Sequence, residues 1–213
     1  GNDAADADAA VVAFGDVTPT IDVSKSAVPG SVPEPGALVL FTVQVHNTSS
    51  EAVSLMELSD SVFGDLLDAE NPAVSANTCP EQGRTIPVAG LFACAFEALV
   101  VGDFGDPDHV DLVTAAVADG EGNLVTGSDD AVVSFSDVLP TLAVVKTPSV
   151  GTVTEPGGQV TFAVEVENLS VEAVTLAALV DDVYGDLLDR DNPAVESNTC
   201  PAQPATIAVG ATL

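Results

Sequence analysis

Residues 34–47 read EPGALVLFTVQVHN, and this stretch decides the fold class. Val39, Phe41, Val43 and Val45 occupy alternate positions in it, with Thr, Gln and His among the residues between them. A period of two is typical of a half-buried β-strand. The Glu-Pro-Gly that precedes the strand has Pro second and Gly third, which suits a tight turn. The stretch therefore predicts a turn that leads into a core strand.

The same pattern returns later in the chain. Glu155-Pro156-Gly157 lies 121 positions after Glu34-Pro35-Gly36, and Pro140 lies 121 positions after Pro19. An ungapped alignment of 17–92 with 138–213 gives 40 identities in 76 positions. Self-similarity at a fixed period is typical of a tandem-repeat protein.

The period assigns every part of the chain to a repeat. Residues 1–16 align with the end of the repeat and are predicted to be the last strand of a preceding copy. Residues 17–137 form one complete repeat, and 138–213 form the N-terminal part of a further one, truncated or completed by another chain. A sandwich without its last strands would expose apolar edges, so we expect either a continuous natural array or strand donation between chains.

Seven strands are expected in the complete repeat, without helical periodicity. Short strands separated by Gly and Pro turns indicate an all-β fold of tandem immunoglobulin-like antiparallel sandwiches. The expected spans are 20–27, 37–47, 52–60, 73–78, 84–101, 109–119 and 124–136, with a break in the fifth near Ala89-Gly90.

Charge narrows the choice of partners. The chain has 33 acidic and four basic residues, a net charge of −29. Such a surface repels phosphate backbones and anionic headgroups, so we expect no nucleic-acid partner. No apolar run approaches the ~18 residues of a membrane helix, and no membrane insertion of this segment is expected. The acidity favours solubility, cation binding, or both.

The cysteines fit the same period. Cys79 and Cys94 lie in the complete repeat with 14 residues between them, and Cys200 is the equivalent of Cys79. We predict a Cys79–Cys94 disulfide, with the partner of Cys200 beyond the chain end. A zinc site is the less favoured alternative, because each repeat offers two Cys and no neighbouring His. Disulfides indicate an oxidising, extracytoplasmic compartment.

Acidic loops are the candidate ligand sites. Alternate loops of a sandwich gather at opposite ends, which predicts carboxylates on both sides of each junction between repeats. The loops that carry the six candidate ligands named below are expected at one end of the sandwich. At the opposite end, Asp119, Glu121 and Asn123 are expected close to the incoming Asp16. Hard oxygen ligands suit calcium, the one cofactor that we consider; a solvated acidic rim is the alternative. The candidate calcium ligands are Asp65, Asp68, Asp103, Asp106, Asp108 and Asp137.

Catalysis has little support in the sequence. His46 is replaced by Glu167 in the next repeat, and no nucleophile elbow, metalloprotease helix or phosphate loop is present. We therefore expect no enzyme activity. Asn47-Thr48-Ser49 and Asn168-Leu169-Ser170 match the glycosylation sequon, but each Asn could equally close a strand and turn the chain.

Several motifs carry a resemblance to a known family. They are Lys-(Ser/Thr)-x4-(Ser/Thr)-Val-x-Glu-Pro-Gly at 25–36 and 146–157, the Phe-x-Val-x-Val-x-Asn strand, the run 119–123 and the run 129–133. The chain resembles the conserved surface-repeat domain of unknown function, immunoglobulin-like, found in long secreted bacterial and archaeal proteins. The resemblance implies spacers, stalks or wall-associated fibres, and no catalytic residues.

The expected function is that of an extracellular or cell-surface structural protein. Its repeats would form a stalk or filament, with neighbouring repeats or copies of the chain as partners. An adhesin module that binds a partner directly is one alternative. The accessory repeat array of a secreted enzyme is the other.

Overall fold

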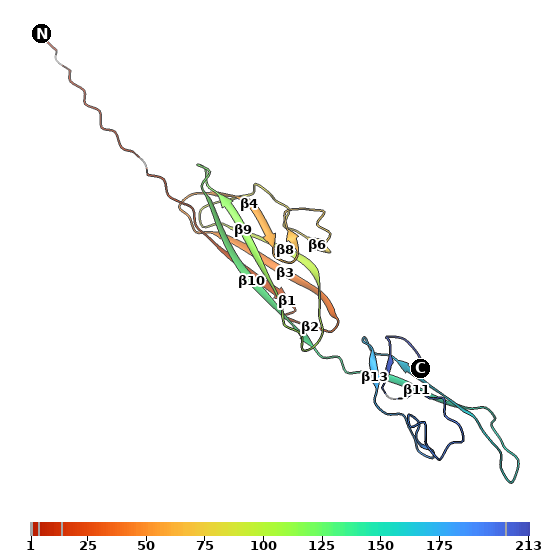
Figure 1. The fold of residues 1–213 in the computed structure, drawn as a ribbon. Coiled ribbons are helices and arrows are strands. Elements are labelled where there is room, and N and C mark those ends of the chain that lie inside the picture. Colours follow the sequence, from red (N-terminus) through yellow and green to blue (C-terminus); the bar gives the residue numbers. More distant parts are fainter. Residues whose placement is uncertain (1, 4, 14, 203) are drawn as a thin grey trace. The chain divides into compact units, whose positions relative to one another are not determined.

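The computed structural model describes residues 2–3, 5–13, 15–202 and 204–213, and this part of the chain is all β. No helix is assigned within it. The strands form several antiparallel sheets, an arrangement consistent with a β-sandwich. The chain divides into two compact units, the first with residues 1–31, 38–100 and 107–134, the second with 32–37, 101–106 and 135–213 (Figure 1).

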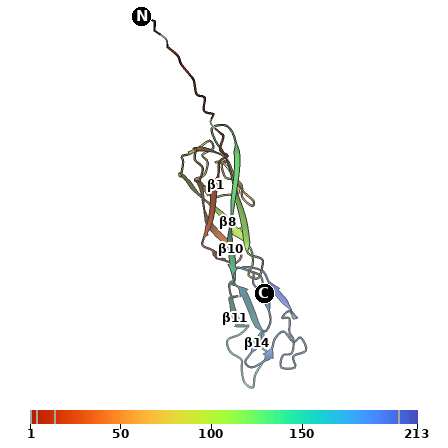
Figure 2. The same ribbon diagram turned by 90° about the vertical axis from the view of Figure 1, so that its left-hand side faces the viewer.

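Two sheets build the region up to residue 136. One has the order β1-β3-β8-β6, and the other has the order β2-β10-β9-β4-β5 with β7 paired to β4. The long strands β1 and β10 run along the length of this two-sheet region in both views (Figures 1 and 2). The bounds are β1 (Ile21–Val28), β2 (Ser31–Pro33), β3 (Gly36–Asn47), β4 (Val53–Asp60), β5 (Gly64–Asp65), β6 (Ala76–Asn77), β7 (Thr85–Ile86), β8 (Leu91–Val101), β9 (His109–Ala118) and β10 (Leu124–Ser136).

Strand β3 has the orientation that its alternation predicts. Val39, Phe41, Val43 and Val45 are fully buried, and they form the centre of the core. The Phe41 ring stacks on Phe96 of β8 at 5.0 Å between ring centroids. The aliphatic core is therefore completed by a small aromatic cluster, in which Phe63 packs against both of these rings.

The Glu-Pro-Gly turn also places the Glu34 carboxylate where it accepts hydrogen bonds from the backbone. Gly36 has a φ of 131°, a backbone conformation that side chains disfavour. Within the second unit, the Glu34 carboxylate accepts N–H bonds from Phe104 at 2.6 Å and Val138 at 2.7 Å. These bonds lower the pKa of Glu34, the Val138 N–H more than the Phe104 N–H. Glu34 thus fixes the start of the segment that follows β10.

The second unit contains fewer and shorter strands (Figure 2). Its strands pair as β11 with β12, β13 with β16 and β14 with β15. A small core gathers Val166, Leu176, Leu188, Ala205 and Ile207. The bounds are β11 (Leu142–Pro148), β12 (Phe162–Asn168), β13 (Val174–Leu176), β14 (Val180–Asp181), β15 (Gly185–Asp186) and β16 (Ala205–Ile207).

The predicted domain boundaries stay predictions. The described residues of 1–16 carry no assigned strand. Residues 1, 4 and 14 of this segment lie outside the described residues.

Candidate functional site

A disulfide joins Cys79 to Cys94, the pair indicated by the repeat spacing. The Cα atoms are 5.0 Å apart, and Cys94 lies in β8. Both cysteines are buried. Cys200 is a free cysteine. The bond closes the irregular segment between β6 and β8 onto the core.

Carboxylates gather at the end of the first unit where the chain enters it. Asp16, Asp119 and Glu121 place one oxygen each within 4.8 Å of one another, as their predicted positions suggested. The Asn123 amide donates to Asp16 and to Asp119, each at 2.9 Å. Together with Glu51 these three acids are called the entry cluster below.

The electrostatics of the entry cluster follow from like charges held close. The Glu121 carboxylate raises the pKa of Glu51, and desolvation, Asp119 and Asp16 add to the effect. The pKa of Asp119 is lowered instead, chiefly by the Asn123 side-chain amide. A divalent cation would relieve this repulsion, and three or four carboxylates are ligands that calcium accepts.

The six predicted calcium ligands do not form a comparable group. Within the described residues, Asp16, Asp119 and Glu121 are the group of three or more ligands that meets the 4.8 Å distance, and it includes none of the six. All six are exposed. Asp65 and Asp68 cap local turns by accepting the N–H groups of Leu67 and Glu70. Asp106 accepts the N–H of Asp103 at 3.2 Å.

Asp137 and Asp108 have different surroundings from these four residues. Calcium near some of the six stays a prediction. Asp137 lies beside Glu34, and its pKa is raised by partial desolvation and by this neighbouring carboxyl group. Asp108 lies in the segment just before β9, with an exposed side chain.

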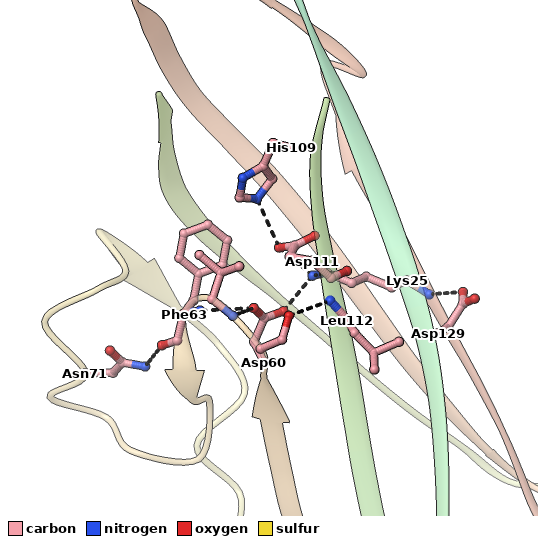
Figure 3. A network of polar contacts seen from close by, with 10 residues as sticks. Lys25, Asp60, Phe63, Asn71, His109, Asp111, Leu112 and Asp129 are labelled. Atoms are coloured by element: carbon pink, nitrogen blue, oxygen red, sulfur yellow. Dashed lines mark hydrogen bonds and ion pairs between the residues drawn. The ribbon is translucent and has the colours of Figure 1, made fainter. Parts of the chain in front are cut away.

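A second polar site lies inside the core of the first unit. Lys25 of β1 places its Nζ 2.6 Å from Asp60 Oδ2, at the end of β4, and 2.6 Å from Asp111 Oδ2, in β9. All three side chains have no exposed surface. Figure 3 shows them pointing toward one another. These residues are called the buried triad.

Aromatic rings and one histidine surround the buried triad. The Lys25 Nζ lies 4.7 Å from the Phe41 ring centroid and 5.6 Å from that of Phe96. His109 Nε2 is 3.6 Å from Asp111 Oδ2. Burial raises the pKa of Asp111, and contact with Lys25 opposes this effect only in part. Asp60 and Asp111 differ in their backbone hydrogen bonds, since Asp60 Oδ1 also accepts the N–H groups of Val62 and Phe63.

The buried triad is not among the sites predicted from the sequence, and its Asp60, at the end of β4, is buried. A signal was present, because Lys25 and Lys146 are the only lysines and lie 121 positions apart. In β1, Lys25 is also in step with Ile21, Val23 and Ala27, the residues that face inward.

Lys146 and Asp181 make the equivalent pair in the second unit. Lys146 also lies 4.3 Å from the Phe162 ring centroid and 5.4 Å from that of Tyr184. The Lys146 contact, with the N–H groups of Val183 and Tyr184, lowers the pKa of Asp181 to about 2. The Lys146 side chain is 34% exposed, because no counterpart of β9 covers it within the described residues.

The two sequons have a structural explanation. Asn47 and Asn168 are both fully buried. Asn47 Nδ2 donates to Glu51 O, Ile86 O and Pro87 O, and Asn168 Nδ2 donates to Glu172 O and Ile207 O. In the folded chain these buried amides stabilise turns. This is the structural role given above as the alternative to glycosylation.

Comparisons with known proteins found structural similarity alone. No family model matches the chain, and no curated protein matches it, so the resemblance to the surface-repeat family stays a prediction. A structural-genomics target, SoR45, has a TM-score of 0.35 and 14% identity, over 55% of this chain and 86% of that one.

Two further matches are bacterial surface proteins. BcpA, the major pilin subunit of Bacillus cereus, has a TM-score of 0.27 and 9% identity, over 90% of this chain and 66% of that one. The C-terminal domain of the AgI/II polypeptide BspA of Streptococcus agalactiae has a TM-score of 0.24 and 12% identity, over 91% and 77%. Within the described residues, no helix is long and apolar enough to span a membrane.

Proposed function

We propose that this chain is part of an extracellular, non-enzymatic structural protein whose tandem immunoglobulin-like repeats form a surface stalk or filament. The observation that carries the proposal is a set of side-chain contacts that recurs at an offset of 121 residues. Asn71 Nδ2 donates to Phe63 O at 2.8 Å, and Asn192 Nδ2 donates to Tyr184 O at 2.7 Å.

Other contacts recur at the same offset. Asn77 donates to Leu66 O, as Asn198 does to Leu187 O. Lys25 pairs with Asp60, as Lys146 does with Asp181. Repetition of both residues and contacts supports a repeated structural unit, and a chain of such units suits a spacer whose partners are neighbouring repeats or copies of itself.

Setting and ligand are supported by chemistry. The Cys79–Cys94 disulfide supports an oxidising, extracytoplasmic location. The net charge of −29 keeps such a surface hydrated and disfavours nucleic acid and anionic membranes. The entry cluster supports calcium binding at the point where the chain enters the sandwich.

Labelling of intact cells tests the proposal. An antibody raised against residues 17–137, detected with gold particles by electron microscopy, should decorate projections outside the cell envelope. Gold confined to the cytoplasm would contradict the proposal. Label on a diffuse layer that carries a separate catalytic activity would favour the accessory-array alternative, and loss of attachment to a target surface after antibody treatment would favour the adhesin alternative.

A further inference from the structure

The buried triad poses an electrostatic problem. It contains one basic and two acidic side chains, and none of the three has exposed surface. With all three ionised, the site would hold one uncompensated negative charge in an apolar, partly aromatic interior. Burial of an unpaired charge is strongly unfavourable, so a group in such a place becomes neutral instead. One of the two carboxyl groups must therefore carry a proton.

The hydrogen bonds identify which carboxyl group is protonated. Asp60 Oδ1 accepts two backbone N–H bonds, at 2.9 Å from Val62 and 3.0 Å from Phe63, and such bonds favour the charged form. Among the described residues, neither carboxylate oxygen of Asp111 has a hydrogen-bond partner. Its Oδ2 atom lies 2.6 Å from Lys25 Nζ and 3.6 Å from His109 Nε2. Burial raises the pKa of Asp111, which agrees with a neutral acid at this position.

The arrangement places a nucleophile, a base and an electrophile together in a site without exposed side-chain surface. We propose that Lys25 and Asp111 form an intramolecular isopeptide bond, with Asp60 as the base. Asp60 and Asp111 each hold an oxygen 2.6 Å from the same Lys25 Nζ, so little motion separates the ionic contact from bond formation.

The reaction balances without a cofactor or an oxidant. The Asp60 carboxylate takes one proton from the Lys25 ammonium, and the free amine attacks the Asp111 carboxyl carbon, forming a C–N bond. A second nitrogen proton passes through Asp60 to the Asp111 hydroxyl group, which leaves as water when its C–O bond breaks. The products are a secondary amide, one water molecule and neutral Asp60. The positive charge of Lys25 and the negative charge of Asp60 are both removed from the interior. Their removal favours the amide in this apolar setting.

The bond would join the two sheets of the sandwich. Lys25 lies on β1, in the four-stranded sheet, and Asp111 lies on β9, in the six-stranded sheet. A covalent link across the core prevents the sheets from separating when the chain is pulled. The second unit offers an internal control, since Lys146 pairs with Asp181 but the position 121 residues after Asp111 lies outside the 213 residues.

Intact mass spectrometry of the 213-residue chain tests the proposal directly. All three cysteines are first reduced and alkylated, so that the disulfide makes no contribution. The expected mass is that of the sequence minus one water molecule. A mass equal to that of the full sequence would overturn the proposal and leave a buried ion-pair network.

Tryptic digestion locates the link. Trypsin cleaves after Lys25, Arg84 and Lys146, but an acylated Lys25 resists cleavage. Peptides 1–84 and 85–146 should therefore remain joined after reduction. A link confined to 1–84 would show Asp60 as the acyl donor and contradict the assignment. Loss of water with normal cleavage at Lys25 would indicate a succinimide, for example at Asp119-Gly120, and would also contradict it.

Variants separate the three roles. Lys25→Ala and Asp60→Asn should retain the full mass, because one lacks the nucleophile and the other lacks the base. Asp111→Asn should still join the two peptides, with loss of ammonia in place of water. Lys146→Ala is the matched control and should keep the loss of one water. The proposed roles would be wrong if Lys146→Ala also abolished the loss of water. They would also be wrong if Asp60→Asn formed the link as completely as the unchanged chain. If a variant fails to fold, the mass of the unchanged chain still shows whether the isopeptide bond forms.

Discussion

At the scale of the residue, Asn47 shows how one buried amide organises several backbone segments. Its Nδ2 donates to carbonyl groups of Glu51, Ile86 and Pro87, and its Oδ1 accepts the Ser49 N–H at 2.9 Å. The side chain is fully buried at the end of β3. Asn47 therefore joins the β3–β4 turn to the segment after β7, and Asn168 makes equivalent bonds in the second unit.

The first prediction concerns this amide. Asn47→Ala should lower the free energy of unfolding by about 2 to 3 kcal/mol, because it leaves buried carbonyl groups without their donor. Urea denaturation followed by circular dichroism measures the change. Asn2→Ala, at an exposed position, is the control and should have an effect within about 0.5 kcal/mol. Equal stability of the two variants would show that the bonds of Asn47 contribute little.

At the scale of the element, the disulfide compensates for a lack of regular structure. Between β6 and β8 the chain forms only the two-residue strand β7, and Cys79–Cys94 closes a loop with a sequence separation of 15. Replacing both cysteines by Ala should lower the free energy of unfolding by about 3 kcal/mol, since the unfolded chain regains the entropy of an open loop.

Cys200 supplies the matched control for the disulfide. Cys200→Ala removes a free cysteine and should leave the urea midpoint nearly unchanged. A shift for Cys200→Ala as large as that of the double variant would contradict the assigned pairing.

The entry cluster leads to a prediction about calcium. At a free calcium concentration about 100 times Kd, the first unit should gain about 2.7 kcal/mol in free energy of unfolding, and a chelator should remove this gain. Thermal denaturation with calcium and with chelator measures it. The double variant Asp16→Asn and Glu121→Gln should lose the response, because it removes two of the clustered charges.

A matched variant controls for general charge effects of calcium. Asp22→Asn also removes an exposed acid, from β1 and outside the cluster, and should keep the response to calcium. Identical melting curves with calcium and with chelator would leave the cluster as a solvated acidic surface.

Strands with clear alternation could be predicted closely from the sequence. The expected spans 20–27, 37–47, 52–60, 109–119 and 124–136 each match an observed strand within about one residue at either end. The break expected near Ala89-Gly90 is present, with Ala89 at a φ of 53°. The short strands β2 and β5 were missed, because two or three residues carry no readable period.

The sites were predicted less well, for a physical reason. Asp16 lies close to Asp119 and Glu121 because their segments share one end of the sandwich. This proximity could be predicted from the order of the strands. The buried triad depends on the register between strands distant in sequence, which places Lys25 beside Asp111, 86 positions away in sequence. Local patterns contain no information about such a register.

At the scale of the whole molecule, the 121-residue period is the central feature of the chain. Residues 17–92 and 138–213 share 40 of 76 residues, and equivalent asparagines and lysines make equivalent contacts. The second unit also exposes apolar side chains on its strands, among them Val144, Val145 and Phe162. Exposed apolar surface of this kind is typical of a surface that packs against further protein.

The mass of the natural polypeptide tests the repeat account most directly. An antibody against residues 17–137 is used to detect the protein in the extracellular and envelope fractions, under denaturing and reducing conditions, and mass spectrometry then measures the captured chain. A tandem array predicts a single chain much heavier than the 21.4 kDa of these 213 residues. A natural chain close to 21.4 kDa would contradict the tandem array.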